Sequence, residues 1–385
     1  MEMIDLYAPC HFGLEAVLKR ELQDLHFEIT ETEDGRVHFR GGLDAIPRAN
    51  LFLRTAERVL IKIGDFKAES FDELFEKTHA LDLAAWLPED ARFWVTKANS
   101  VKSRLFSPSD IQSIVKKAIV EKLKEQYHTD TIAETGAAYP IRISIVKDRV
   151  LMGLDTSGLS LHKRGYRLNS VFAPISETLA AALILLSYWQ PGRILVDPFS
   201  GSGTFPIEAA LIASDTAPGL FRSFTAEDWK MIPKRLWYEA SEEARTRIRQ
   251  AEPGLIRGYD IDPKAVRTAE ENARLAGVEQ LVRFRTRDVA QLEEKEAYGF
   301  ILTNPPYGER LMEKEALPEL YRTLGERFSA LRDWSMYVIS SYEHCEADIG
   351  RKADRNRKIY NGMLKTYFYS FLGPKPKKTE EGGHA

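Results

Sequence analysis

Cysteine is scarce in this chain: only two of the 385 residues, Cys10 and Cys345, carry a thiol. Two thiols cannot build a disulfide framework or a cysteine-rich zinc site, and this usage fits a reducing cytosol best. Long apolar runs are lacking as well, because the most apolar helical stretch, 178–189, is shorter than the roughly 20 residues that span a bilayer. The first residues show no basic start followed by an apolar segment. We therefore expect a cytoplasmic protein without a signal peptide and without a membrane partner.

Net charge is also small, at −3, which taken alone argues weakly against a nucleic-acid partner. The charge is unevenly distributed, however. Residues 1–91 carry a balance of −9, residues 92–167 carry +7, and residues 168–385 carry −1. A basic segment between acidic and neutral flanks indicates a nucleic-acid surface, although ordinary solvated helix faces would give the same excess.

Hydrophobic periodicity divides the chain into three folded regions and a tail. Residues 1–66 are predicted to form strand, helix, strand, strand, helix and strand, the order of a ferredoxin-like domain. Residues 67–167 are predicted to form a second α+β module, with a helix beginning after Ser107. In residues 168–373 strands alternate with helices, which predicts an open, doubly wound, mostly parallel α/β sheet of Rossmann-like type. The polar tail 374–385 is predicted to be disordered.

A turn rich in small residues lies between an apolar strand ending at Asp197 and the next helix. Small residues let a ligand approach the backbone closely, and the N-terminus of a helix is electropositive. The turn lacks the Gly-Lys-Ser/Thr of a phosphate-binding loop, and Pro206 stands where the dinucleotide fingerprint has its third glycine. The candidate cofactor-binding residues here are Asp197, Phe199, Ser200, Gly201, Ser202, Gly203 and Thr204. A plain tight turn remains the alternative.

Carboxylates follow the next two strands of this region. Asp260 ends the strand 255–259 directly, and an acid at that place holds ribose hydroxyls in nucleotide-binding folds. Asp262 precedes Pro263 and is expected to cap the following helix. Asp288 follows the strand 282–286 and is the candidate acceptor for an adenine amino group, with a surface turn as the alternative.

The most specific feature is the segment Asn304-Pro305-Pro306-Tyr307 after a short apolar strand. The Asn304 side chain and the Pro305 carbonyl offer two acceptors for one exocyclic amine, which aims the nitrogen lone pair at an electrophile. Tyr307 offers an aromatic face on which a base can stack. These four residues are the candidate catalytic residues, and a simple prolyl turn is the alternative.

These segments resemble motifs I, II and IV of class I S-adenosylmethionine-dependent amino-methyltransferases. Residues 45–160 resemble a THUMP RNA-binding domain after its ferredoxin-like companion. Residues 161–167 and 174–182 resemble the linker and first helix of the RlmL/YpsC-like group. The resemblance implies S-adenosylmethionine as the cofactor, no metal, and methyl transfer to the exocyclic N2 of a guanine in large-subunit ribosomal RNA. The implied partner is RNA, with ribosomal RNA ahead of transfer RNA.

Three alternatives stay open at this point. Asn-Pro-Pro-Tyr is shared with adenine-N6 methyltransferases, so this motif does not separate guanine from adenine. A transfer-RNA guanine-N2 methyltransferase and a non-enzymatic RNA-binding assembly factor are the others. The cations expected to grip the RNA backbone come from the basic segment and are Lys97, Lys102, Arg104, Lys163, Arg164 and Arg167.

Overall fold

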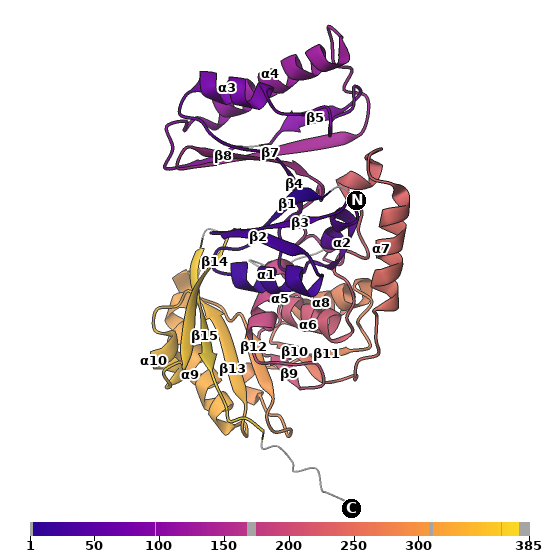
Figure 1. Ribbon diagram of the computed structural model, residues 1–385. Coiled ribbons are helices and arrows are strands. Elements are labelled where there is room, and N and C mark those ends of the chain that lie inside the picture. Colours follow the sequence, from indigo (N-terminus) through magenta and orange to yellow (C-terminus); the bar gives the residue numbers. More distant parts are fainter. Residues whose placement is uncertain (1–2, 97, 168–174, 308–310, 363, 377–385) are drawn as a thin grey trace, which may run out of the picture. The chain divides into compact units, whose positions relative to one another are not determined.

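The computed structural model describes residues 3–96, 98–167, 175–307, 311–362 and 364–376 (Figure 1). The chain forms two compact units. Unit 1 consists of residues 1–10, 18–161 and 222–246, and unit 2 consists of residues 11–17, 162–221 and 247–385. Within the described ranges, no helix has both the length and the apolar character that a membrane crossing requires.

Unit 1 is built on one sheet whose strands are joined in the order β2-β3-β1-β4-β8-β7-β5, with β6 pairing β7. Its strands are β1 (Ile4–Pro9), β2 (Glu28–Glu33), β3 (Arg36–Gly41), β4 (Leu60–Lys67), β5 (Arg92–Val95), β6 (Asn99–Val101), β7 (Ala138–Val146) and β8 (Arg149–Asp155). Its helices are α1 (Glu15–Asp24), α2 (Ala45–Phe52), α3 (Phe71–His79), α4 (Pro108–Tyr127) and α7 (Lys234–Thr246). Helix α1 belongs to unit 1 from residue 18 onward, and α7 lies in the segment 222–246.

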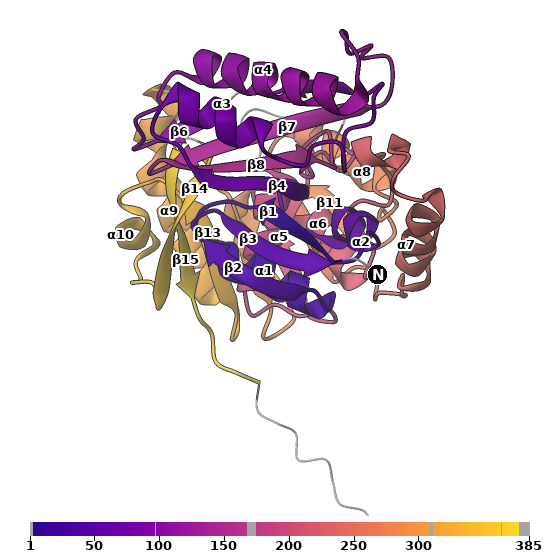
Figure 2. The same cartoon turned by 45° about the horizontal axis from the view of Figure 1, so that its top comes forward.

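The first part of unit 1 confirms the ferredoxin-like prediction. Elements β1 to β4 follow the predicted order, and β1 pairs antiparallel with both β3 and β4. The sheet then continues through the antiparallel pairs of β4 with β8 and of β8 with β7, so the second α+β module shares the same sheet. Helices α3 and α4 lie together on one face of that second part (Figures 1 and 2).

Residues 222–246 pack within unit 1, although they lie inside the sequence region 168–373. The Trp229 ring stacks on Tyr139 with centroids 4.6 Å apart, and its Nε1 donates to the Ala138 carbonyl at 2.8 Å. On α7, Glu243 accepts from Arg48 Nε at 2.9 Å. The large aromatic ring of Trp229 buries its apolar area against β7, which ties the segment to the sheet of unit 1.

Unit 2 contains a seven-stranded sheet in the order β11-β10-β9-β12-β13-β15-β14. Its strands are β9 (Leu195–Asp197), β10 (Ile256–Asp260), β11 (Val282–Thr286), β12 (Phe300–Thr303), β13 (Ser335–Ser340), β14 (Arg355–Asn361) and β15 (Leu364–Phe371). Its helices are α5 (Glu177–Leu186), α6 (Thr204–Ala213), α8 (Pro263–Leu275), α9 (Leu311–Ala330) and α10 (Cys345–Ile349), and the short 3₁₀ turn η2 (Val289–Gln291) follows β11.

Helices cover both faces of this sheet, as a doubly wound fold requires. Successive residues of one strand enter different core layers: Leu195 packs with α5 and α6, whereas Val196 packs with α9. The five strands from β11 to β13 are parallel, and β15 and β14 complete the sheet in antiparallel fashion. The predicted α/β class is therefore confirmed, and the terminal β14–β15 hairpin is an element that the sequence reading did not identify. Strand order reverses between β9 and β12, the place where ligands bind in open α/β sheets.

Candidate active site

The carboxyl ends of β9 and β12 are tied together by one buried carboxylate. Asp197 is 2% exposed, and its Oδ1 accepts from the Thr303 hydroxyl at 2.6 Å and from the Phe199 amide at 3.1 Å. Burial raises the pKa of Asp197 to about 7, against the lowering effect of these two hydrogen bonds. Thr303 directly precedes Asn304, so Asp197 fixes the small-residue turn and the Asn-Pro-Pro-Tyr segment in one register.

The small-residue turn adopts backbone angles that suit glycine. Gly201 and Gly203 have φ values of +52° and +86°, and a Cβ on Gly203 would lie 2.8 Å from Cζ of Phe284. Gly203 is the N-cap of α6 and supplies no side chain to the first amides of that helix. The other predicted residues of the turn, Ser200, Ser202 and Thr204, are buried, and Phe199 is half-buried. The turn therefore presents backbone amides and the positive end of α6 to a ligand.

The two acids predicted after β10 have separate tasks. Asp260 Oδ2 accepts from the Gly201 amide and its Oδ1 accepts from the Asp262 amide, both at 2.9 Å. Asp262 caps α8 by accepting from the Lys264 amide at 2.8 Å, as expected. Since each carboxylate oxygen has two lone pairs, Asp260 keeps acceptor capacity for hydroxyl groups beside the turn.

After β11, Asp288 is half-buried, and its Oδ1 accepts from the Ala290 amide at 2.8 Å as the N-cap of η2. The cap fixes the side chain at the carboxyl end of the strand next to β10. The printed cap bond uses one of its two carboxylate oxygens, and its role as an acceptor for an adenine amino group stays a prediction.

Two buried polar atoms of the site have no hydrogen-bond partner among the described residues. They are Asn304 Oδ1, after β12, and Ser200 Oγ, after β9. A buried polar atom left unsatisfied costs about 1–3 kcal/mol, so a native structure tolerates it where a ligand supplies the partner. These atoms, together with the glycine turn and Asp260, fit a nucleoside-type cofactor beside an amine-bearing substrate.

Three residues that position the Asn-Pro-Pro-Tyr segment were not found from the sequence. Tyr321 of α9 donates its hydroxyl proton to the Pro306 carbonyl at 3.2 Å and, with that proton committed, accepts from Ser340 Oγ at 2.7 Å. Asn361, at the end of β14, donates from Nδ2 to the Tyr307 hydroxyl at 3.5 Å. These partners come from distant elements of unit 2, and no local spacing in the sequence signals them.

The predicted RNA-binding cations divide into two groups, with Lys97 outside the described residues. Lys102, Arg104 and Lys163 have exposed side chains, and Arg104 pairs with Glu69 at 2.6 Å on the surface. The structure does not support Arg164 and Arg167 as RNA contacts, because both guanidinium groups are committed inside unit 2.

The Arg164 side chain is 3% exposed and lies 3.5 Å from a Glu208 oxygen that also accepts from the Tyr166 hydroxyl. Arg167 pairs with Glu177 at 3.3 Å and hydrogen-bonds to the Thr204 hydroxyl. These arginines hold the linker against α5 and α6. Two such cations in an apolar setting require acidic partners, which explains why Glu177 and Glu208 are buried.

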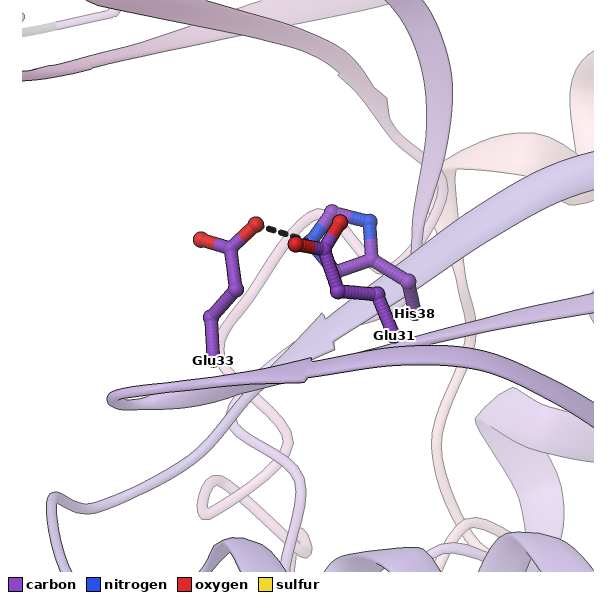
Figure 3. A group of neighbouring side chains, drawn as sticks. All are labelled: Glu31, Glu33 and His38. Atoms are coloured by element: carbon purple, nitrogen blue, oxygen red, sulfur yellow. Dashed lines mark ion pairs between the residues drawn. The ribbon is translucent and has the colours of Figure 1, made fainter.

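A second polar cluster lies in unit 1 and contains Glu31, Glu33 and His38 (Figure 3). Their potential ligand atoms lie within 4.8 Å of one another. Arg149 already pairs with both glutamates, at 3.3 and 3.0 Å, and with Asp65 at 2.8 Å. Burial lowers the pKa of His38 to about 4, so its imidazole is neutral at pH 7. We read this group as an ion-pair network whose acids already have a cation.

Comparison with known proteins assigns each part of the chain. Three family models match: the RlmL ferredoxin-like domain over residues 5–60, the THUMP domain over residues 68–155, and the RMKL-like methyltransferase domain over residues 164–369. The chain belongs to the RMKL-like methyltransferase family. The last of these models covers more than half of the chain and includes every residue of the site described above.

Individual relatives extend over nearly the whole chain. The "Putative RNA methyltransferase YpsC" of Bacillus subtilis (strain 168) is 47% identical over 99% of this chain and 100% of its own length. The "Ribosomal RNA large subunit methyltransferase K/L" of Syntrophotalea carbinolica is 36% identical over 96% of this chain, which spans 53% of that relative. The crystal structure of "SMU.472, a putative methyltransferase complexed with SAH" is 40% identical, with a TM-score of 0.91, and covers 98% of this chain and 100% of its own.

Proposed function

We propose that this RMKL-like methyltransferase transfers a methyl group from S-adenosylmethionine to the exocyclic N2 of a guanine in large-subunit ribosomal RNA. The observation that carries the proposal is the buried Asn304 Oδ1 at the switch point of the sheet, which has no hydrogen-bond partner among the described residues. The THUMP model, the relative named for large-subunit ribosomal RNA and the homologous structure with bound SAH support it. With ribosomal RNA as the substrate, the activity would lie in the cytoplasm.

The substrate amine would be oriented by two carbonyl oxygens of the Asn304–Pro305 pair. Because Pro306 follows Pro305, no amide N–H of that residue competes for these acceptors. Tyr321 holds the Pro306 carbonyl from the other side and keeps the turn in place. With both N–H bonds directed to acceptors, the nitrogen lone pair points away from the protein, toward the electrophile. Tyr307 would stack on the base.

The cofactor would occupy the edge formed by the ends of β9, β10 and β11. Asp260 would accept from ribose hydroxyls and Asp288 from the adenine amine, while the positive end of α6 would favour the carboxylate of the cofactor. When bound, S-adenosylmethionine supplies a methyl group on a positively charged sulfur, which is the electrophile of the reaction. Asp197 and Ser200 line the same edge from β9 and its turn.

An exocyclic amine inside a duplex faces its pairing partner, so the target base must be unpaired or flipped to reach Asn304. Exposed cations of unit 1, Lys102 and Arg104, and Lys163 of the linker would then hold the RNA backbone. The shared Asn-Pro-Pro-Tyr motif favours one second candidate, methyl transfer to adenine N6 in RNA or DNA.

The deciding experiment compares methylated nucleosides of ribosomal RNA, transfer RNA and DNA from cells with and without the gene. Loss of N2-methylguanosine from large-subunit ribosomal RNA is the expected result, and re-expression should restore it. Loss of N2-methylguanosine from transfer RNA alone would show that the substrate is transfer RNA and not ribosomal RNA. An unchanged RNA profile with lost N6-methyladenine in DNA would contradict the proposal.

A further inference from the structure

The β14–β15 hairpin of unit 2 carries two lysines and two tyrosines in a checkerboard. Antiparallel pairing places Lys358 opposite Tyr367 and Tyr360 opposite Lys365. Cross-strand partners and residues two apart on one strand project from the same face, so these four side chains share one face of the hairpin. We call them the hairpin platform.

The hairpin platform is accessible and rich in positive charge. Both lysines are exposed and both tyrosines are half-buried. Lys358 Nζ lies 5.1 Å from the Tyr360 ring centroid, and Lys365 Nζ lies 5.2 Å from the Tyr367 centroid. Residues 351–365 contain six lysines and arginines against one aspartate. Among the described strands, β14 is the edge strand of this sheet.

The platform is joined to the candidate active site through its own strand. Asn361 follows Tyr360 and donates to the Tyr307 hydroxyl at 3.5 Å. Phe12, 48% exposed, meets the Tyr360 ring edge-on with centroids 6.2 Å apart and extends the aromatic surface. The platform therefore lies on the same hairpin whose end contacts the Asn-Pro-Pro-Tyr segment, although Asn361 projects from the opposite face of β14.

We propose that the hairpin platform binds the single-stranded RNA that flanks the target nucleotide. Sequence-tolerant binding of single strands combines cations that pair with phosphates and aromatic rings on which successive bases stack. Here each ring face is covered by a lysine of the same strand. A phosphate would draw the ammonium group away and open that face to a base. The inference rests on RNA being the substrate, as proposed above.

Binding of a fluorescein-labelled, unstructured RNA 12-mer to the full chain tests the platform, measured by anisotropy over a series of salt concentrations. The double variant Lys358→Ala/Lys365→Ala should weaken binding at least tenfold. It should also reduce the slope of log K against log salt by about 1.4, since each phosphate contact contributes roughly 0.7 for single strands. Tyr360→Leu/Tyr367→Leu should weaken binding by about tenfold or more with little change in slope.

The opposite edge of the same sheet provides a matched control. Arg283 and Arg285 on β11 are also exposed, and Arg283→Ala/Arg285→Ala removes the same charge. This control should bind RNA within about twofold of the wild type. If Lys358→Ala/Lys365→Ala and Arg283→Ala/Arg285→Ala weaken RNA binding equally, each with a normal melting temperature, the platform proposal is wrong. Lys358→Arg/Lys365→Arg should restore binding if loss of charge, and not misfolding, causes the effect.

Two readouts separate this inference from the proposed function. If the lysine variant loses RNA binding and the wild type forms no methylated nucleoside, the platform stands and the proposed reaction fails. If the wild type methylates RNA and the lysine variant keeps the same KM, the reaction stands and the platform is wrong. Affinity for SAH should be unchanged in all hairpin variants.

Discussion

Two polar clusters among the described residues differ in their charges and in their place in the fold: the closed cluster of unit 1 (Glu31, Glu33, His38 and Arg149) and the open cluster of unit 2 (Asp197, Ser200, Thr303 and Asn304). In unit 1, Arg149 pairs with both glutamates beside His38, whereas both ring nitrogens of that buried histidine lack a hydrogen-bond partner among the described residues. In unit 2, Asp197 and Thr303 satisfy each other, while Asn304 Oδ1 and Ser200 Oγ are buried without a partner among the described residues. Dense polar grouping alone therefore does not mark a site. The stronger indication is that Asn304 and Ser200 follow β12 and β9, where the strand order reverses and ligands bind in open α/β sheets.

The largest expected effect comes from removing the Asn304 side chain from the open cluster. Asn304→Ala removes the acceptor that orients the substrate amine, and loss of one such preorganised contact typically lowers turnover by about 10²–10³. Single-turnover transfer of labelled methyl groups to RNA measures it, alongside SAH affinity, which should stay within twofold. Arg149→Leu, in the closed cluster, is the control and should leave transfer unchanged. Equal losses in both variants would erase the distinction between the clusters.

The next largest effect is expected at Arg164, one of the two linker arginines that the sequence predicted to bind RNA. Arg164→Leu leaves Glu208 buried without its cation, and breaking such a pair costs about 3–5 kcal/mol of unfolding free energy. Urea denaturation measures the loss. The double variant Arg164→Leu/Glu208→Leu should recover most of it. If Arg164→Leu instead keeps full stability and loses RNA affinity, the assignment of Arg164 to the interior is wrong.

A smaller effect is expected from the residue that supports the prolines. Tyr321→Phe removes the donor to the Pro306 carbonyl and should lower kcat roughly three- to tenfold, the value of one hydrogen bond. The KM for RNA should hardly change, because Tyr321 holds the turn and does not contact substrate. An increase in KM at constant kcat would show that the residue serves binding.

The two clusters should also respond to pH in opposite directions. The folded-state pKa of Asp197, about 7, lies above the ordinary value of 3.8, so its contribution to stability is present at low pH and is lost as pH rises toward 7. The folded-state pKa of His38, about 4, lies below 6.5, so its contribution is present above pH 6.5 and is lost as pH falls toward 4.

Urea unfolding between pH 4 and 7.5 checks these slopes, each at most about 1.4 kcal/mol per pH unit. Relative to the wild type, Asp197→Asn should gain stability as pH rises, and His38→Phe should gain stability as pH falls. Parallel pH profiles for wild type and variant would show that the group in question does not titrate as described.

Much of the fold follows from local pattern. Strand β11 has the predicted bounds 282–286, and a helix follows the small-residue turn as predicted. The β14–β15 hairpin was missed because its exposed strand reads as a charged segment, and its burial depends on pairing with β13. Residues 222–246 were missed as part of unit 1 because only tertiary packing brings Trp229 to Tyr139.

The site residues that could be predicted are those that stand at the carboxyl end of a strand. Asp197, Asp260 and Asn304 each follow an apolar strand, and parallel strands bring their carboxyl ends together. The supporting contacts of Tyr321 and Asn361 come from other elements and depend on three-dimensional packing. Net charge identified a basic segment but did not separate exposed Lys102 from buried Arg164. The buried ion pair of Arg164 with Glu208 cannot be read from the sequence alone.

We conclude that the ligand site is the open cluster of unit 2, around Asp197 and Asn304. The closed cluster of unit 1, around His38, is not expected to bind the ligand. Hydrogen–deuterium exchange of the full chain with and without SAH tests this conclusion most directly. We expect protection of residues 197–204, 258–262 and 286–290, and unchanged exchange over residues 28–40. Protection centred on residues 28–40, or none at 197–204 under saturating SAH, would contradict it.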